Sequence, residues 1–101
     1  MIASFRDKET ETLWQLGKSR RLPADLGRRA SQKLAILNAA VTLDNLNGPP
    51  GNRFEALRGS RAGQHRIRVN DPYRVCFEWR EENAFEVEIV DYHSSEYPWP
   101  D

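Results

Sequence analysis

Two short stretches of the sequence carry side chains that could cut a phosphodiester bond. The first runs from Arg53 to Gly59 and includes Glu55 and Arg58, and the second is Asp91-Tyr92-His93. Cleaving RNA without a metal requires a base for the 2′-hydroxyl, an acid for the departing 5′-oxygen and cations for the phosphate. Histidine can donate or accept a proton near neutrality, whereas arginine stays charged and can only stabilise. A glutamate needs a pKa raised by burial to be an efficient base.

Neither stretch by itself establishes a catalytic site. A histidine just past a strand end is often an ordinary surface residue, and Glu55 has an alternative role as the ion-pair partner of a nearby arginine. However, a sheet can bring the loop before one strand, Arg74 on the next strand and the end of the last strand into one cleft. This arrangement would place Glu55, Arg58, Arg74 and His93 together.

The elements that must position these residues can be predicted from the sequence. Residues 2–5 suggest a short opening strand, and Asp7 can cap a helix that ends near Gly17, with Leu13, Trp14 and Leu16 on its apolar side. A second helix begins near Pro23, and its apolar stripe is Leu26, Ala30, Leu34, Leu37 and Val41. Arg28, Arg29, Gln32 and Lys33 fall away from this stripe, so the helix should lie across a sheet.

The second half of the chain predicts strands. Residues 47–52, with two prolines between glycines, form a connector. Beyond it, residues 66–69 and 75–79 alternate as a hairpin, and Phe85, Val87 and Ile89 alternate as a third strand that ends near residue 90. The predicted fold is a small α+β domain over residues 1–93, with both helices on one face of a mostly antiparallel sheet. Residues 94–101 form a C-terminal tail of unassigned role.

Composition narrows the class of protein. The 101 residues are 39% hydrophobic and 30% charged, which fits one folded domain. One cysteine cannot form an internal disulfide, and there is neither a signal-like leader nor a membrane-length apolar run, so a cytoplasmic location without membrane contact is expected. One cysteine and two histidines predict no metal site, and no cofactor motif is present.

The charge pattern is compatible with a nucleic-acid partner although the net charge is zero. Five arginines and one histidine stand against one acid between residues 53 and 68, whereas residues 78–101 hold eight acids against one arginine. Arginine suits bidentate phosphate contacts and stacks on bases. The candidate RNA-binding residues are therefore Arg53, Arg61, His65, Arg66 and Arg68. The alternative is a solvated basic face.

Several segments together resemble the HigB branch of the RelE-type toxins. They are residues 1–5, Gly51–Gly59, residues 63–70, Tyr73–Phe77 and the closing Val90–His93. The resemblance covers nearly the whole chain. It implies the compact RelE-type fold, ribosome-dependent cleavage of messenger RNA in the A site of the 70S ribosome, and neutralisation by a helix-turn-helix antitoxin of HigA type that joins the toxin to operator DNA.

The resemblance also assigns roles to residues. The family's terminal aspartate, tyrosine and histidine correspond to Asp91, Tyr92 and His93, and its strand arginine corresponds to Arg74. Arg58 replaces a family lysine, and Glu55 stands where a histidine is often found. The resulting hypothesis has Glu55 as base or orienting group, His93 as acid, Arg58 and Arg74 on the phosphate, Asp91 orienting and Tyr92 stacking on a base.

Two other functions stay open. The chain could be a catalytically weak, toxin-like binding module that acts only with its antitoxin in a DNA-binding repressor complex, because the loop histidine is absent. It could also be a nuclease acting on free RNA. The first predicts intact messenger RNA on expression, and the second predicts cleavage without ribosomes.

Overall fold

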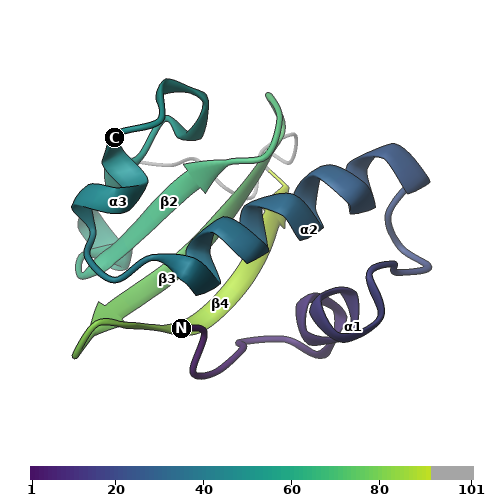
Figure 1. The fold of residues 1–101 in the computed structure, drawn as a ribbon, viewed down its shortest axis with the longest axis horizontal. Coiled ribbons are helices and arrows are strands. Elements are labelled where there is room, and N and C mark those ends of the chain that lie inside the picture. The colour runs from purple at the N-terminus through teal and green to yellow at the C-terminus, as the bar shows by residue number, and fades with distance from the viewer. Residues whose placement is uncertain (92–101) are drawn as a thin grey trace.

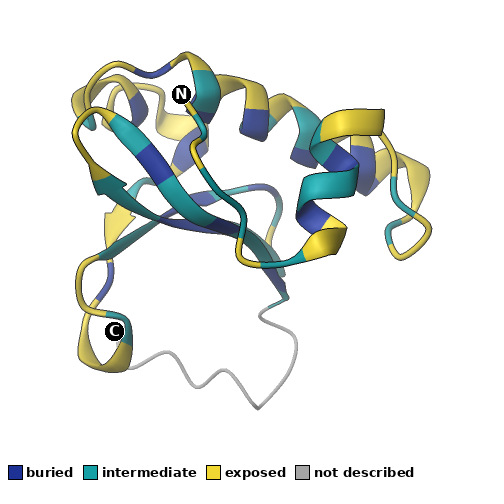
Figure 2. Cartoon of the chain, turned by 90° about the horizontal axis from the view of Figure 1, so that it is seen from below, coloured by how far each residue is buried: buried dark blue, intermediate teal, exposed yellow. Residues whose placement is uncertain are grey.

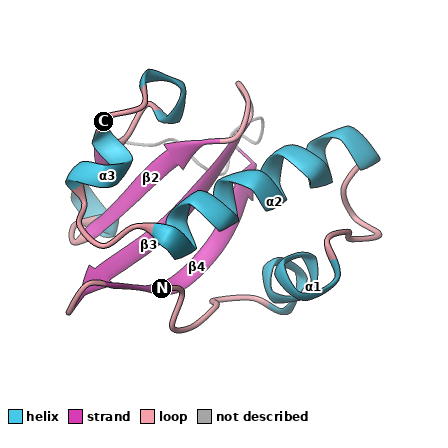
Figure 3. Cartoon of the chain, viewed as in Figure 1, coloured by secondary structure: helices cyan, strands magenta, loops and turns pink. Residues whose placement is uncertain are grey.

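The computed structural model describes residues 1–91 and has two layers, helices over a sheet (Figures 1 and 3). Tyr92, His93 and the predicted tail 94–101 lie outside the described residues. In chain order the elements are α1 (Lys8–Leu16), α2 (Ala24–Ala39), α3 (Asp44–Asn47), η1 (Pro50–Asn52), β1 (Glu55–Ala56), η2 (Gly59–Arg61), β2 (Gln64–Arg68), β3 (Tyr73–Arg80) and β4 (Asn83–Asp91).

The four strands form an antiparallel sheet in the order β1-β2-β3-β4. This confirms the α+β fold and the three-strand meander. The sheet gains β1, which was predicted only as a loop beside the strands. Glu55 pairs with Arg66 and Ala56 with His65, so the stretch with the candidate glutamate is an edge strand.

Helix α1 has the predicted ends. The carboxylate of Asp7 accepts the N–H of Thr10 at 3.2 Å, and Gly17 adopts a left-handed conformation with φ 77° in which its N–H reaches Leu13. A left-handed residue after a helix is typically glycine because it has no Cβ to clash. Leu13 is fully buried, but Leu16 is 67% exposed and does not belong to the predicted apolar side.

Helix α2 buries the predicted stripe Leu26, Ala30, Leu34 and Leu37 against the sheet. Val41 was predicted as the fifth member and is not one. Ala40 is extended (φ −68°, ψ 134°) and ends the helix, so Val41 lies beyond the periodic face and is 57% exposed.

The predicted opening strand is present only as two isolated parallel bridges to β4, Ile2 with Ala84 and Phe5 with Val87. Between them β4 carries a bulge, because Glu86 adopts φ 53° and its N–H donates to Ser4 Oγ at 2.9 Å. The bulge breaks the predicted alternation before Val87, because Ala84 rather than Phe85 is buried in the main core. After the bulge Val87 is buried and Ile89 is partly buried against the same core, as predicted, and Val90 is buried in a separate cluster.

The two faces of the sheet differ. The helices cover one face, where Ile67, Val75 and Phe77 join the main core. Figure 2 shows the opposite face without either long helix, and there Leu57, Cys76 and Val90 form a small separate cluster. None of the helices within residues 1–91 has the length and apolar character needed to span a bilayer.

Candidate functional site

The turn between β2 and β3 gathers arginines. Arg68 and Arg74 are register partners, which places two like charges directly opposite each other. Both are directed at the turn: Arg68 Nη2 contacts Asp71 Oδ1 at 2.7 Å, and Arg74 Nη1 donates to the carbonyls of Asn70 and Asp71. The hydrogen bond and charge of Arg68 lower the pKa of Asp71, with smaller contributions from Arg53 and Arg74.

A lysine from α2 reaches the same region. Lys33 Nζ donates to Asn52 Oδ1 at 2.7 Å, and the fully buried Asn52 donates to the carbonyl of Leu46 at 3.1 Å. Burial, and then the charge of Arg68, lower the pKa of Lys33. The residue after Asn52, Arg53, is held in a left-handed conformation with φ 44°. We call Lys33, Arg53, Arg68 and Arg74 the basic cluster.

Glu55 faces an arginine of the neighbouring strand. Its Oε1 accepts from Arg66 Nη2 at 2.8 Å and from Nε at 3.2 Å, and the side chains are 51% and 7% exposed respectively. This is the ion pair raised as an alternative to catalysis. A hollow at the edge strand is lined by Glu55, Ala56, Leu57 and Arg58. The carbonyl of Arg58 accepts the N–H of Arg61 at 3.3 Å, and the Arg58 side chain makes no hydrogen bond or ion pair with any residue that the structure describes.

Arg61 lies in a different network from the basic cluster. Its Nη1 is 2.8 Å from both Gln64 Oε1 and Glu88 Oε2, and Arg6 also contacts Glu88 at 3.3 Å. The antiparallel sheet thus brings Glu88 of β4 beside Arg61, one of the five arginines between residues 53 and 68. Charge that is segregated along the sequence is partly paired in space.

His65 is half-buried between aromatic rings. Its ring stacks on Phe54 with centroids 5.4 Å apart and lies 5.8 Å from Phe77, and its Nδ1 has no hydrogen-bond partner among the described residues. Burial lowers the pKa of the imidazole. The ring of His65 is therefore part of the aromatic packing around β2.

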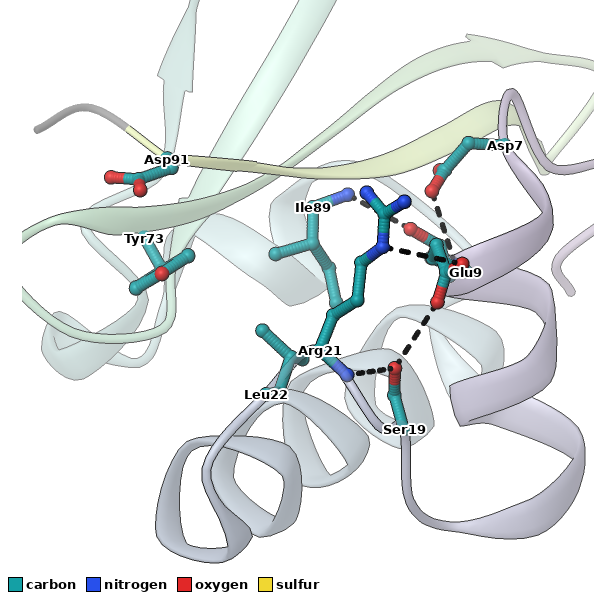
Figure 4. Close-up of a pocket in the computed structure, with 9 residues that line it drawn as sticks. Asp7, Glu9, Ser19, Arg21, Leu22, Tyr73, Ile89 and Asp91 are labelled. Atoms are coloured by element: carbon teal, nitrogen blue, oxygen red, sulfur yellow. Dashed lines mark hydrogen bonds and ion pairs between the residues drawn. The ribbon is translucent and has the colours of Figure 1, made fainter. Parts of the chain in front are cut away.

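Asp91 lies at the end of β4 and pairs in register with Tyr73, the first residue of β3. Burial raises the pKa of Tyr73, helped by the charge of Asp91 and a hydrogen bond to it. Both residues line a cavity of about 290 Å³ between the sheet, α1 and the loop after it (Figure 4). Arg21 and Glu9, 3.6 Å apart, line its other side.

The structure therefore brings some predicted residues together and separates others. Arg74, Arg68, Arg53 and Asp91 lie at one end of the sheet, whereas Glu55 and Arg66 form a pair of their own, Arg61 joins Glu88, and His65 is packed between rings. Tyr92 and His93 lie outside the described residues. Sequence reasoning missed Lys33, which looked like one of several polar residues on α2, and Asp71, which looked like a turn residue. Within residues 1–91 there is no group of metal-ligating side chains.

Comparison with solved structures shows the fold. A crystal structure of YafQ from E. coli strain BL21(DE3) superimposes with a TM-score of 0.59, covering 92% of this chain and 96% of that one at 11% identity. A crystal structure of a YafQ mutant from E. coli gives a TM-score of 0.58 at 10% identity, with the same coverage. At these identities the similarity concerns the fold alone.

Comparison of sequences shows the family. Toxin HigB-1 of Vibrio cholerae is 42% identical over 80 residues, which is 78% of this chain and 84% of that protein. Endoribonuclease HigB of Proteus vulgaris is 28% identical over 93 residues, 92% of this chain and 100% of that protein. Residues 3–93 match the family described as RelE-like toxin of type II toxin-antitoxin system HigB, and the chain belongs to that family of HigB-like toxins.

Proposed function

We propose that this chain is an endoribonuclease that cuts messenger RNA in the ribosomal A site by 2′-hydroxyl attack, without a metal ion. The name of the Proteus vulgaris relative supports the reaction class. The observation that carries the proposal is the end of the sheet where Arg74 pairs in register with Val90, next to Asp91. A strand arginine beside the final strand is the cation that a developing phosphate charge requires.

In this mechanism His93 protonates the departing 5′-oxygen, and Arg58 and Arg74 stabilise the charge on the phosphate. Asp91 orients the terminal residues, and Tyr92 stacks on a base of the messenger RNA. Glu55, whose Oε1 accepts from Arg66, orients that guanidinium rather than acting as the base, and the proton of the attacking 2′-hydroxyl passes to a water molecule in the A site. The ribosome supplies part of the positioning, which explains how so few acid-base groups suffice.

As a member of a toxin-antitoxin family, the chain has an antitoxin partner. We propose that this partner is a helix-turn-helix protein of HigA type, and that the complex binds operator DNA through the antitoxin. The other partners are the 70S ribosome and its messenger RNA, which implies action in the cytoplasm.

Single-turnover cleavage on programmed ribosomes tests the proposal. The wild type, freed of bound metal by EDTA and dialysis before it is added to the ribosomes, should cut A-site messenger RNA. His93→Ala should slow the reaction by about 10²- to 10⁴-fold, the usual contribution of a general acid. Free RNA of the same sequence should stay largely intact. Equal rates for the wild type and His93→Ala would remove histidine from the chemistry.

A second function is favoured by one observation, the Glu55–Arg66 ion pair. If the 2′-hydroxyl cannot lose its proton fast enough without a base at position 55, the chain is a toxin-like binding module that acts with its antitoxin in a repressor complex. Inducible expression would then leave growth and messenger RNA ends unchanged, while the antitoxin would still be bound tightly. Mapped cleavage within codons on expression would exclude this function.

A further inference from the structure

The basic cluster concentrates charge in a way that folding alone does not require. Its four cations come from α2, the end of η1, β2 and β3, and Arg68 and Arg74 are directly opposite each other across two strands. Like charges in that position are destabilising. The conformation of Arg53, with φ 44°, is also uncommon for a residue other than glycine. The basic cluster therefore combines opposed like charges with an unfavourable backbone conformation.

The placement of Lys33 adds to this. Its ammonium is held at 2.7 Å by the buried amide of Asn52. Burial and Arg68 both disfavour the charged form of Lys33 and lower its pKa. Asn52 is itself fixed through the carbonyl of Leu46, so the lysine is directed by an internal residue. An anion placed between Lys33 and Arg68 would remove the repulsion that the free protein carries.

One carboxylate, that of Asp71, neutralises part of the positive charge of the basic cluster. Asp71 Oδ1 contacts Arg68 Nη2 at 2.7 Å, yet the Asp71 side chain is 89% exposed. An ion pair this exposed contributes little to stability. A carboxylate that lies in solvent on a short turn can be exchanged for a phosphate at small cost, and the phosphate offers more acceptor oxygens to the arginine fork.

We propose that Lys33, Arg53 and Arg68 form a second phosphate site, which holds the RNA backbone beside the bond that is cut and which Asp71 occupies until RNA displaces it. This rests on the proposed function, since the ligand is the substrate of the same active site. Arg74 links the two places: it is the proposed catalytic cation, and its guanidinium also holds the carbonyls of the Asp71 turn.

Binding of a 2′-O-methyl RNA oligonucleotide tests the site without cleavage, because that RNA lacks the attacking hydroxyl. Lys33→Gln should weaken binding several-fold and reduce the slope of log affinity against log salt by about 0.7, the value for one cation on a single strand. Asp71→Asn should tighten binding, because it removes the competing carboxylate. The matched control is Lys18→Gln, which makes the same charge change on an exposed residue outside the cluster and should change nothing.

The outcomes separate this inference from the proposed function. If Lys33→Gln and Asp71→Asn both bind the oligonucleotide like the wild type, and melt like it, the phosphate site is wrong. If inorganic phosphate protects the wild type against thermal unfolding while the oligonucleotide does not bind, the site takes a free anion and the RNA assignment is wrong. If the variants shift binding as expected but the wild type cuts no messenger RNA on ribosomes, the site stands and the proposed function fails.

Discussion

The role of Glu55 can be separated from its contribution to stability by two substitutions. Both of its hydrogen bonds from Arg66 end on the same oxygen, Oε1, at 2.8 and 3.2 Å. The amide oxygen of Glu55→Gln can accept both, so this variant loses the charge and keeps the geometry. Glu55→Ala removes the acceptor and takes a partner away from Arg66, whose side chain is only 7% exposed.

The expected magnitudes differ accordingly. Because Glu55 is half exposed, losing its charge should cost about 0.2–1 kcal/mol, the range for exposed ion pairs. Removing the acceptor from a largely buried guanidinium should cost about 1–3 kcal/mol. In a domain of this size 1 kcal/mol shifts Tm by about 4–8 °C, so the two variants should be distinguishable by thermal unfolding.

The assay is single-turnover cleavage on programmed ribosomes, measured beside thermal unfolding for both variants. If Glu55 only orients Arg66, Glu55→Gln should cut at close to the wild-type rate, and Glu55→Ala should lose rate and stability together. Glu81→Gln, on the exposed turn between β3 and β4, is the charge control. A normally folded Glu55→Gln with a rate lower by about 10²-fold or more would refute this reasoning and make the glutamate a base.

Three further predictions concern other parts of the molecule. Arg58→Ala should slow cleavage without lowering Tm, because the Arg58 side chain is exposed and makes no polar contact within residues 1–91; a parallel loss of Tm would show a structural role instead. Burial lowers the pKa of His65 in the folded state, so below about pH 6.5 the unfolded chain binds a proton that the folded chain binds less readily, and the free energy of unfolding should fall as the pH falls. His65→Gln should reduce this fall, measured as urea midpoints on either side of that pH. Leu34→Ala, at a fully buried position on the core-facing side of α2, should cost about 2–5 kcal/mol in chemical unfolding, and a loss below about 1 kcal/mol would mean that the core collapses around the missing atoms.

Local patterns predicted most of the architecture. The cap residue Asp7, the glycine at position 17 and the apolar stripe of α2 indicated helix ends close to those observed, because each acts within a few residues of itself. The meander followed from alternation and turn residues. The bulge at Glu86 could not be predicted this way, because the group that stabilises it is Ser4, which lies 82 residues away.

The candidate site was predictable in part for the same reason. Residue type alone indicated the arginines and the glutamate, but their partners depend on strand register, which pairs Glu55 with Arg66 and brings Arg61 to Glu88. Lys33 reaches the cluster through Asn52, a contact between two segments that no periodicity links. Composition suggests which charges are present, whereas the sheet decides which of them remain available to a ligand.

The pairing of residues 2–5 with β4 has a consequence for synthesis. These residues are made long before β4, the strand that holds them. Until β4 emerges, residues 2–5 lack their strand partner, and the strand that carries Arg74 has an open edge able to pair with other chains. The sheet end proposed for catalysis is therefore assembled only after β4 has been made, and we expect a nascent chain without β4 to leave the messenger RNA that encodes it uncut.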